Sequence, residues 1–123
     1  MAKNDRRSPC PVSCTLDLLG DRWTLLVIRD LFAGKTQFKH LVASPEGIAT
    51  NILSDRLGRL LEAGLIDRKP LPEHQGRFVY HLTQRGLSLG PVLRAVADWG
   101  LAHIDDTEAR ISIEPRGKKG RKS

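Results

Sequence analysis

The periodicity of the sequence changes in a fixed order between Gln37 and Gly86, and this order limits the fold more than any other feature. Apolar residues at helical spacing form two short groups, which the turn-forming run Ser44-Pro45-Glu46-Gly47 separates. Two short segments with the alternation of strands follow them. We therefore predict a helix, a turn, a second helix and a two-stranded hairpin, which is the order of a winged helix-turn-helix.

The bounds of these elements follow from their end signals. Thr36 is the expected N-cap of the first helix, and the second helix should start at Ala49 or Thr50 and end at Ala63-Gly64. The second helix should bury one apolar stripe, which consists of Leu53, Leu57, Leu60 and Leu61. The face opposite this stripe consists of Asn51, Asp55, Arg59 and Glu62. The strands are expected at residues 65–71 and 77–82, around a turn that contains Gly76.

Further helices are predicted on both sides of this segment. Pro11 suits the first position of a helix that runs to about Leu19. Asp21 should cap a helix from Arg22 to about Phe32, with Gly34 as its C-cap. Thr83 should cap a last helix to about Arg110, in which Pro91 either introduces a kink or marks the true start. The predicted fold class is mainly α with a small β-hairpin.

With 123 residues and 28% charged residues, the chain has the size and composition of one soluble globular domain. We expect this domain at residues 10–110, between a flexible basic arm at 1–9 and a disordered basic tail at 111–123. No apolar run approaches a membrane span, and no secretory signal follows Met1, so we expect a cytoplasmic, nucleoid-associated protein without a membrane partner.

The net charge of +6 is unevenly distributed. Residues 35–85 hold eight Lys or Arg against five Asp or Glu, and residues 115–123 hold five basic residues and no acidic one. Residues 86–114, in contrast, are acidic. The positive charge thus coincides with the helix-turn-helix and the tail, which favours double-stranded DNA as a partner.

A helix-turn-helix reads DNA through polar side chains on the outer face of its second helix, with the N-terminal residues reaching deepest. The candidates for base contacts are Thr50, Asn51, Ser54 and Arg59. Ile52 is expected to tilt outward, where it could meet a thymine methyl group. The candidates for contacts with the DNA backbone are Lys39, Arg56, Arg68, Lys69 and Arg77, the last in the wing.

Many separated positions resemble, in order, the HxlR-type winged-helix regulators, which are related to the MarR group. The N-terminal part of the match is Cys10-Pro11-Val12, Thr15 to Gly20, Trp23 to Leu26 and Arg29 to Leu31. The later part includes Phe38, Gly47-Ile48, Leu53-Ser54, Arg56-Leu57, Gly64-Leu65, Tyr80, Leu82-Thr83, Gly86, Leu89, Pro91 to Leu93 and Trp99-Gly100. The match covers about Cys10 to His103.

This resemblance implies a homodimeric bacterial transcription factor that binds a near-palindromic operator, with the first and last helices at the dimer interface. The interface residues expected on those helices are Val12, Leu16, Leu89, Leu93, Val96, Trp99 and His103. Two residues depart from the pattern or weaken the helix. Ala49 replaces a serine cap, which costs about 1 kcal/mol, and Gly58 costs about 1 kcal/mol relative to alanine.

The resemblance also makes Cys10 a candidate sensor of an oxidant or a small electrophile. Cys10 directly precedes a helix N-terminus, whose partial positive charge favours a thiolate, and Arg6 and Arg7 are close in sequence. The alternative is that Cys10 and Cys14 are small buried hydrophobic residues.

Other classes of protein have less support. No phosphate-binding glycine loop, HExxH motif, nucleophile elbow or CxxC motif is present, so no enzyme activity and no cofactor are expected. The four histidines are scattered, so no metal site is expected either. The chain holds six aromatic residues, four of which are needed in the core, and this disfavours RNA binding. A nonspecific architectural DNA-binding protein and a winged-helix module that binds protein remain alternatives.

Overall fold

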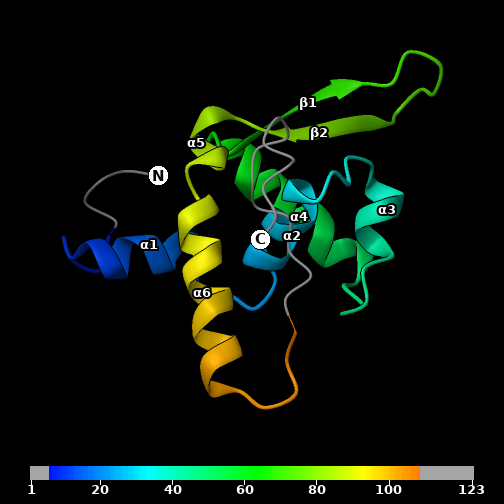
Figure 1. Cartoon of the computed structure of the whole chain (residues 1–123). Coiled ribbons are helices and arrows are strands. Elements are labelled where there is room, and N and C mark those ends of the chain that lie inside the picture. Colours follow the sequence, from blue (N-terminus) through cyan, green and yellow to red (C-terminus); the bar gives the residue numbers. More distant parts are fainter. Residues whose placement is uncertain (1–5, 109–123) are drawn as a thin grey trace.

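The computed structural model describes residues 6–108, and the predictions for residues 1–5 and 109–123 lie outside them. Along the chain of the described residues, four helices are followed by a two-stranded hairpin and then by two more helices (Figure 1). They are α1 (Pro11–Leu19), α2 (Thr24–Phe32), α3 (Phe38–Val42), α4 (Thr50–Glu62), β1 (Ile66–Pro70), β2 (Phe78–Leu82), α5 (Gln84–Leu87) and α6 (Gly90–His103). The predicted class, mainly helical with one β-hairpin, is confirmed.

The core lies where α2, α3 and α4 pack together beneath the hairpin (Figure 1). Ile28 of α2, Leu41 of α3 and Leu53 of α4 are the largest fully buried side chains of the described residues. Leu57 and Leu60 continue the buried stripe of α4, while Leu61 is half-buried at its edge. Burial of this stripe fixes which face of α4 points outward, because a helix with one apolar stripe leaves its opposite side to solvent.

The hairpin is antiparallel, with Ile66 opposite Leu82 and Pro70 opposite Phe78. Phe78 and Tyr80 lie on the same side of β2, as the alternation predicts, and their rings are 6.4 Å apart. The segment before α3 joins this sheet through an isolated bridge between Gln37 and Val79. The hairpin is therefore a wing attached at its base to the helix-turn-helix.

A compact junction connects the end of α4 to α5. Thr83 donates a hydrogen bond from its hydroxyl to the carbonyl of Gly64 at 2.7 Å and accepts one from the backbone N–H of Gly86 at 3.1 Å. The prediction that Thr83 caps a helix is confirmed. At Gly86 a Cβ atom would lie 2.1 Å from the carbonyl oxygen of Leu65, so only glycine allows the two segments to approach so closely.

Several details of the prediction were wrong. The C-terminal part is two helices rather than one, although Pro91 marks the start of α6, as one of the two predicted alternatives had it, in the first turn where a missing N–H costs least. Thr36 does not cap α3, because Gln37 occupies the N-cap position and the carbonyl of Thr36 accepts the N–H of Tyr80 at 2.8 Å. Ile52 does not tilt outward, since it is half-buried and packs against the core.

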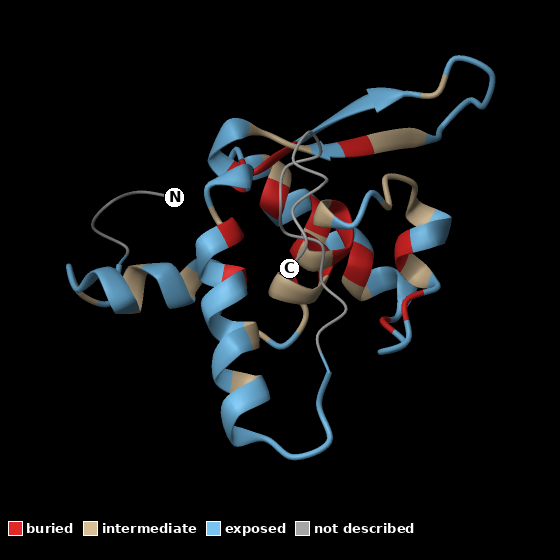
Figure 2. Ribbon diagram, viewed as in Figure 1, coloured by how far each residue is buried: buried red, intermediate tan, exposed pale blue. Residues whose placement is uncertain are grey.

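Helices α1 and α6 extend from the body and keep apolar faces in solvent (Figure 2). Most of the exposed large apolar side chains among the described residues lie on these two helices: Val12, Leu16 and Leu18 on α1, and Val92, Val96, Trp99 and Leu101 on α6. Of the residues expected at a dimer interface, Leu93 is only 4% exposed in the single chain, and Leu89 is half-buried and packs against the core. An apolar surface of this extent is typical of an interaction site.

Candidate DNA-binding interface

The outer face of α4 carries exposed polar side chains along the whole helix. The predicted base-reading residues, Thr50, Asn51, Ser54 and Arg59, are all exposed. The helix begins after Ala49, which has extended backbone and no side-chain capping bond. The first turn of α4 therefore presents backbone N–H groups without a side-chain acceptor, and these can donate to an anion such as a phosphate.

Arg56 occupies a different environment from the other candidates. Its side chain is largely buried, and its Nε donates to Asp21 Oδ2 at 2.7 Å. Its Nη1 donates to Asp55 Oδ2 at 2.5 Å, and the same carboxylate lies 3.7 Å from Nη1 of Arg59. Arg56 is thus committed to an ion pair within the chain, and we do not include it among the proposed contacts with DNA.

The Asp21 carboxylate joins α4 to the start of α2. Burial acts to raise the pKa of Asp21, but hydrogen bonds from Arg56, Thr24 and the Trp23 backbone outweigh it and hold the pKa well below its ordinary value. The hydrogen bond to Asp21 in turn raises the pKa of Arg56. Asp21 accepts the N–H groups of Trp23 and Thr24 at 3.0 and 3.1 Å. The N-cap position is nevertheless Trp23, because α2 starts two residues later than expected, so the prediction of Asp21 at the N-cap position was wrong by two residues.

A second polar cluster holds the turn between α3 and α4. Arg29 forms a bidentate pair with Glu46, with both N···O distances 2.8 Å. The hydrogen bond from Arg29 lowers the pKa of Glu46, and the same bond is the main reason why the pKa of Arg29 is raised. The buried Asp30 accepts a hydrogen bond from the Ser44 hydroxyl, which also accepts one from Nζ of Lys35 at 3.1 Å.

This cluster was not predicted from the sequence. Its one signal was Asp30 at the edge of the apolar stripe of α2, because a buried carboxylate requires hydrogen-bond partners. One of these partners, Ser44, lies in a turn fourteen residues away, and spacing along the chain does not reveal it. By fixing the turn, the cluster positions α4 relative to α3.

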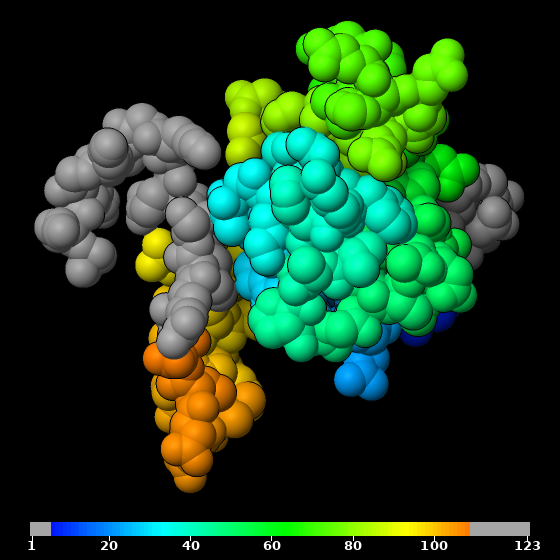
Figure 3. Space-filling model, turned by 90° about the vertical axis from the view of Figure 1, so that its right-hand side faces the viewer, coloured from blue at the N-terminus to red at the C-terminus, as the bar shows by residue number. Residues whose placement is uncertain are grey.

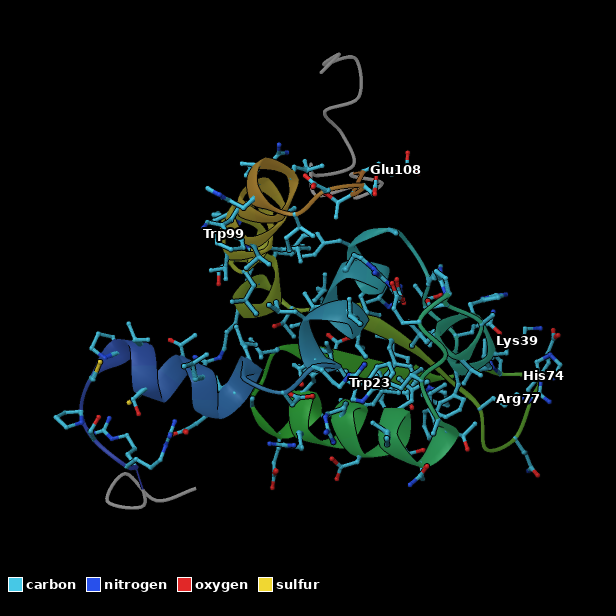
Figure 4. The ribbon with its side chains drawn as sticks, turned by 90° about the horizontal axis from the view of Figure 1, so that it is seen from below. Trp23, Lys39, His74, Arg77, Trp99 and Glu108 are labelled. Atoms are coloured by element: carbon cyan, nitrogen blue, oxygen red, sulfur yellow. The ribbon has the colours of Figure 1, made fainter. Side chains whose placement is uncertain are left out.

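The remaining basic candidates lie on α3 and on the wing. Figure 4 shows Lys39 of α3 at the same end of the molecule as Arg77 and His74 of the wing, far from Trp99. Lys39, Lys69 and Arg77 are exposed. Arg68 is exposed as well, and its guanidinium carbon lies 4.0 Å from the centroid of the Phe78 ring, a cation–π contact that orients it. In the space-filling view of Figure 3, the wing stands directly above α3.

The two cysteines lie at the opposite side of the molecule, on and before α1. Cys10 is exposed at the N-cap position of α1, and Cys14 is half-buried with its thiol 3.4 Å from the carbonyl of Ser8. The alternative that Cys10 is a buried hydrophobic residue is therefore wrong. The guanidinium of Arg7, which is close to Cys10 in sequence, is bound by Asp17 at 2.9 Å.

Residues 6–108 hold neither a metal-binding cluster nor a membrane-spanning helix. No three His, Cys, Asp or Glu side chains of this range come together as ligands for a metal ion. None of its helices is long and apolar enough to cross a bilayer.

Known proteins resemble this chain over most of its length. The chain is 38% identical to the HTH-type transcriptional regulator sll1512 of Synechocystis over 104 residues, which cover 85% of this chain and 77% of that protein. It is 40% identical to the HTH-type transcriptional regulator Rv3095 of Mycobacterium tuberculosis over 79% of this chain, but it spans only 61% of that relative. The redox regulator HypR in its reduced form superposes with a TM-score of 0.72 at 26% identity, over 78% of this chain and 95% of HypR.

The sequence pattern of the HxlR-like helix-turn-helix family matches residues 18–108. This match includes α2 to α6, the recognition helix α4 and the wing among them. The chain thus belongs to the HxlR-like helix-turn-helix family and is a transcriptional regulator of the HxlR type.

Proposed function

We propose that the protein binds operator DNA sequence-specifically as a homodimer, with α4 of each protomer in the major groove. The observation that carries this proposal is the outer face of α4, where Thr50, Asn51, Ser54 and Arg59 are exposed on a helix whose other face is fixed by the core. Asparagine and arginine can each form paired hydrogen bonds with a base edge, the former with adenine and the latter with guanine.

The backbone contacts come from both sides of the helix-turn-helix. Lys39 on α3 and Arg68, Lys69 and Arg77 on the wing are exposed cations that can neutralise phosphates. Phosphate contacts fix the position of a protein on the duplex, and base contacts select the sequence. In this proposal α4 therefore selects the DNA sequence, whereas α3 and the wing contribute affinity.

Dimerisation is supported by the exposed apolar faces of α1 and α6. Val12 and Leu16 of α1 and Val96 and Trp99 of α6 are all more than half exposed in the single chain. Trp99 also stacks with His103, with ring centroids 4.6 Å apart. Covering these side chains with a second copy of the chain would remove them from water and place two α4 helices on successive turns of DNA.

Cys10 is proposed as the sensor of an oxidant or electrophile. Its thiol is exposed next to the apolar face of α1, so a bridge or adduct at Cys10 would alter the contacts of that face. The similarity to the redox regulator HypR supports this role. A nonspecific architectural role is the second candidate, and the excess of basic residues in the helix-turn-helix and the tail favours it.

The test is a titration of fluorescently labelled DNA from upstream of the protein's own gene, with a scrambled duplex of equal length as the control. We expect a preference for the native duplex that persists as salt is raised, because nonspecific binding falls steeply with salt. Equal affinities for the two duplexes, with the same salt dependence, would support the architectural role. Absence of binding to either duplex would point to a module that binds protein.

A further inference from the structure

A series of four charged side chains connects the start of α2 to the outer face of α4. Asp21, just before α2, accepts a hydrogen bond from Nε of Arg56 at 2.7 Å. The same guanidinium donates from Nη1 to Oδ2 of Asp55 at 2.5 Å. That carboxylate oxygen lies 3.7 Å from Nη1 of Arg59, four residues further along α4. The charges alternate in sign, so each side chain of the series lies next to an opposite charge.

The fold holds one end of this series, and the other end is open to a ligand. The side chains of Arg56 and Asp21 are 18% and 24% exposed, whereas those of Asp55 and Arg59 are 56% and 52% exposed. Neighbours in sequence do not face each other on a helix, so helix geometry alone does not bring Asp55 and Arg56 together. The bond to Asp21 holds the Arg56 guanidinium beside α4, where its Nη1 reaches Asp55. The Asp55 carboxylate is therefore held in place by a tertiary contact.

We propose that Asp55 is a positioning residue for Arg59, through which Arg59 selects a guanine instead of binding a phosphate. This inference rests on the proposed function, in which Arg59 contacts a base. An arginine on a recognition helix can bind either group. A fixed carboxylate beside Arg59 repels a phosphate that approaches the same guanidinium, because like charges brought together are costly. Guanine offers two acceptors without a net charge, so the carboxylate does not exclude it.

The position of Asp55 also leaves most donors of Arg59 available for a base. Asp55 faces Nη1, and an arginine carries five N–H donors in a planar fork. Nη2 and Nε remain for paired hydrogen bonds with O6 and N7 of guanine. Asp55 precedes Arg59 by four residues, which is the order of charges that a helix favours. An arginine that is ordered before DNA arrives loses less side-chain freedom on binding.

The first test measures the order of Arg59 in the full chain without DNA, so that its outcome does not depend on the proposed function. Asp55→Asn preserves the shape of the side chain and removes its charge. We expect the order parameter of the Arg59 Nε–H group, obtained from nitrogen relaxation, to fall in this variant. Equal order parameters in the wild type and in Asp55→Asn would overturn the proposal.

Glu62→Gln is the matched control, because it removes the same charge from an exposed residue on the outer face of α4. Glu62 forms no ion pair with another residue of the 6–108 range. This variant should leave the order parameter of Arg59 and the base preference of the protein unchanged. Asp55 and Glu62 are both exposed, so both variants should keep the fold, which circular dichroism would verify.

The second test selects duplexes from a pool with a random central sequence, using the wild type and each variant. We expect the wild type to enrich a G·C pair at one position of each half-site, since a paired arginine–guanine contact discriminates by about tenfold. In Asp55→Asn this preference should fall severalfold, while the affinity for a scrambled duplex should rise, because a negative charge near the phosphates is gone. A merely structural role would lower both.

Arg59→Ala identifies the position that Arg59 contacts. Asp55→Asn should weaken the preference at that same position, and it should have no further effect in the double variant with Arg59→Ala. A change at a different base pair would make Asp55 itself a base contact and would overturn its positioning role. Retention of the wild-type preference in Asp55→Asn would overturn the proposal as well.

Failure of the proposed function gives a different result from failure of this inference. If the wild type enriches no sequence from the pool, sequence-specific binding fails, and the role of Asp55 in selection fails with it. If the wild type enriches a sequence and Asp55→Asn enriches it equally, the proposed function stands and only the role of Asp55 is overturned.

Discussion

Arg56 of the recognition helix donates a 2.7 Å hydrogen bond to the carboxylate of Asp21, thirty-five residues earlier in the chain. Asp21 also accepts the backbone N–H of Thr24, the first residue of α2, so one side chain binds the start of one helix and the middle of another. The pair makes the stability of the domain depend on pH. Because the folded state lowers the pKa of Asp21, the ionised carboxylate contributes stability above its ordinary pKa of about 4, and that contribution is lost as the pH falls further.

Asp21→Asn should therefore destabilise the protein at neutral pH by about 2 kcal/mol, the scale of a hydrogen bond to a charged group. The difference in free energy of unfolding between wild type and variant should stay constant above about pH 5 and shrink below about pH 4. Urea denaturation over a pH series measures it. Asp67→Asn, which alters an exposed carboxylate on β1, is the control and should show no such convergence. A pH-independent difference for Asp21→Asn would contradict the assigned role of its charge.

Gly58→Ala should stabilise the protein by about 1 kcal/mol. Gly58 lies inside α4, and a Cβ built there meets no atom within 4 Å. Gly86→Ala is the contrasting variant, because its Cβ would collide with the carbonyl of Leu65, and it should destabilise. Thermal denaturation of both variants measures whether each substitution stabilises or destabilises the protein. Stabilisation of both, or destabilisation of both, would show that the local packing differs from that described.

Val96→Glu should convert the dimer into a monomer. It places a charge in the middle of the exposed apolar face of α6, where a partner chain would have to bury it. Sedimentation velocity measures the change in mass, and the weaker binding of a monomer to a two-half-site operator should follow. Gln75→Glu adds the same charge at the wing tip and should remain dimeric. Were the wild type itself monomeric at micromolar concentration, the proposed interface would be wrong.

Arg59→Ala should weaken operator binding by about 1–3 kcal/mol if Arg59 contacts a base. The loss should then occur only on operators that carry the base pair that Arg59 contacts. Arg85→Ala removes an exposed arginine from α5, outside the outer face of α4, and should have little effect. Titrations against a set of singly substituted operators make the distinction. A loss that is equal on every duplex would reassign Arg59 to the phosphate backbone.

Cys10→Ser should abolish the response of DNA binding to peroxide or benzoquinone and should leave binding under reducing conditions unchanged. The reason is that the exposed thiol of Cys10 is the more accessible of the two. Cys14→Ser is the paired control and should keep the response. An unaltered response in Cys10→Ser would remove Cys10 from the mechanism.

The elements that depend on local pattern were predictable, and those that depend on contacts between distant segments were not. The leucine stripe of α4 and the alternation of Phe78 and Tyr80 are visible in sequence because helices and strands repeat with fixed periods. Thr36 was misassigned because its carbonyl binds Tyr80, a partner that pattern does not reveal. Arg56 has a side chain that commonly binds phosphate. Only the fold shows that its guanidinium already donates a hydrogen bond to Asp21.

The tight contact between Gly86 and Leu65 has a mechanical consequence. With Thr83 bound to Gly64 on one side and Gly86 against Leu65 on the other, the end of the recognition helix, the root of the wing and α5 turn as one piece. Helix α6 begins at Gly90, three residues after Leu87 ends α5. If α6 forms the interface of the proposed dimer, its direction relative to this unit sets the distance between the two half-sites that the dimer can span.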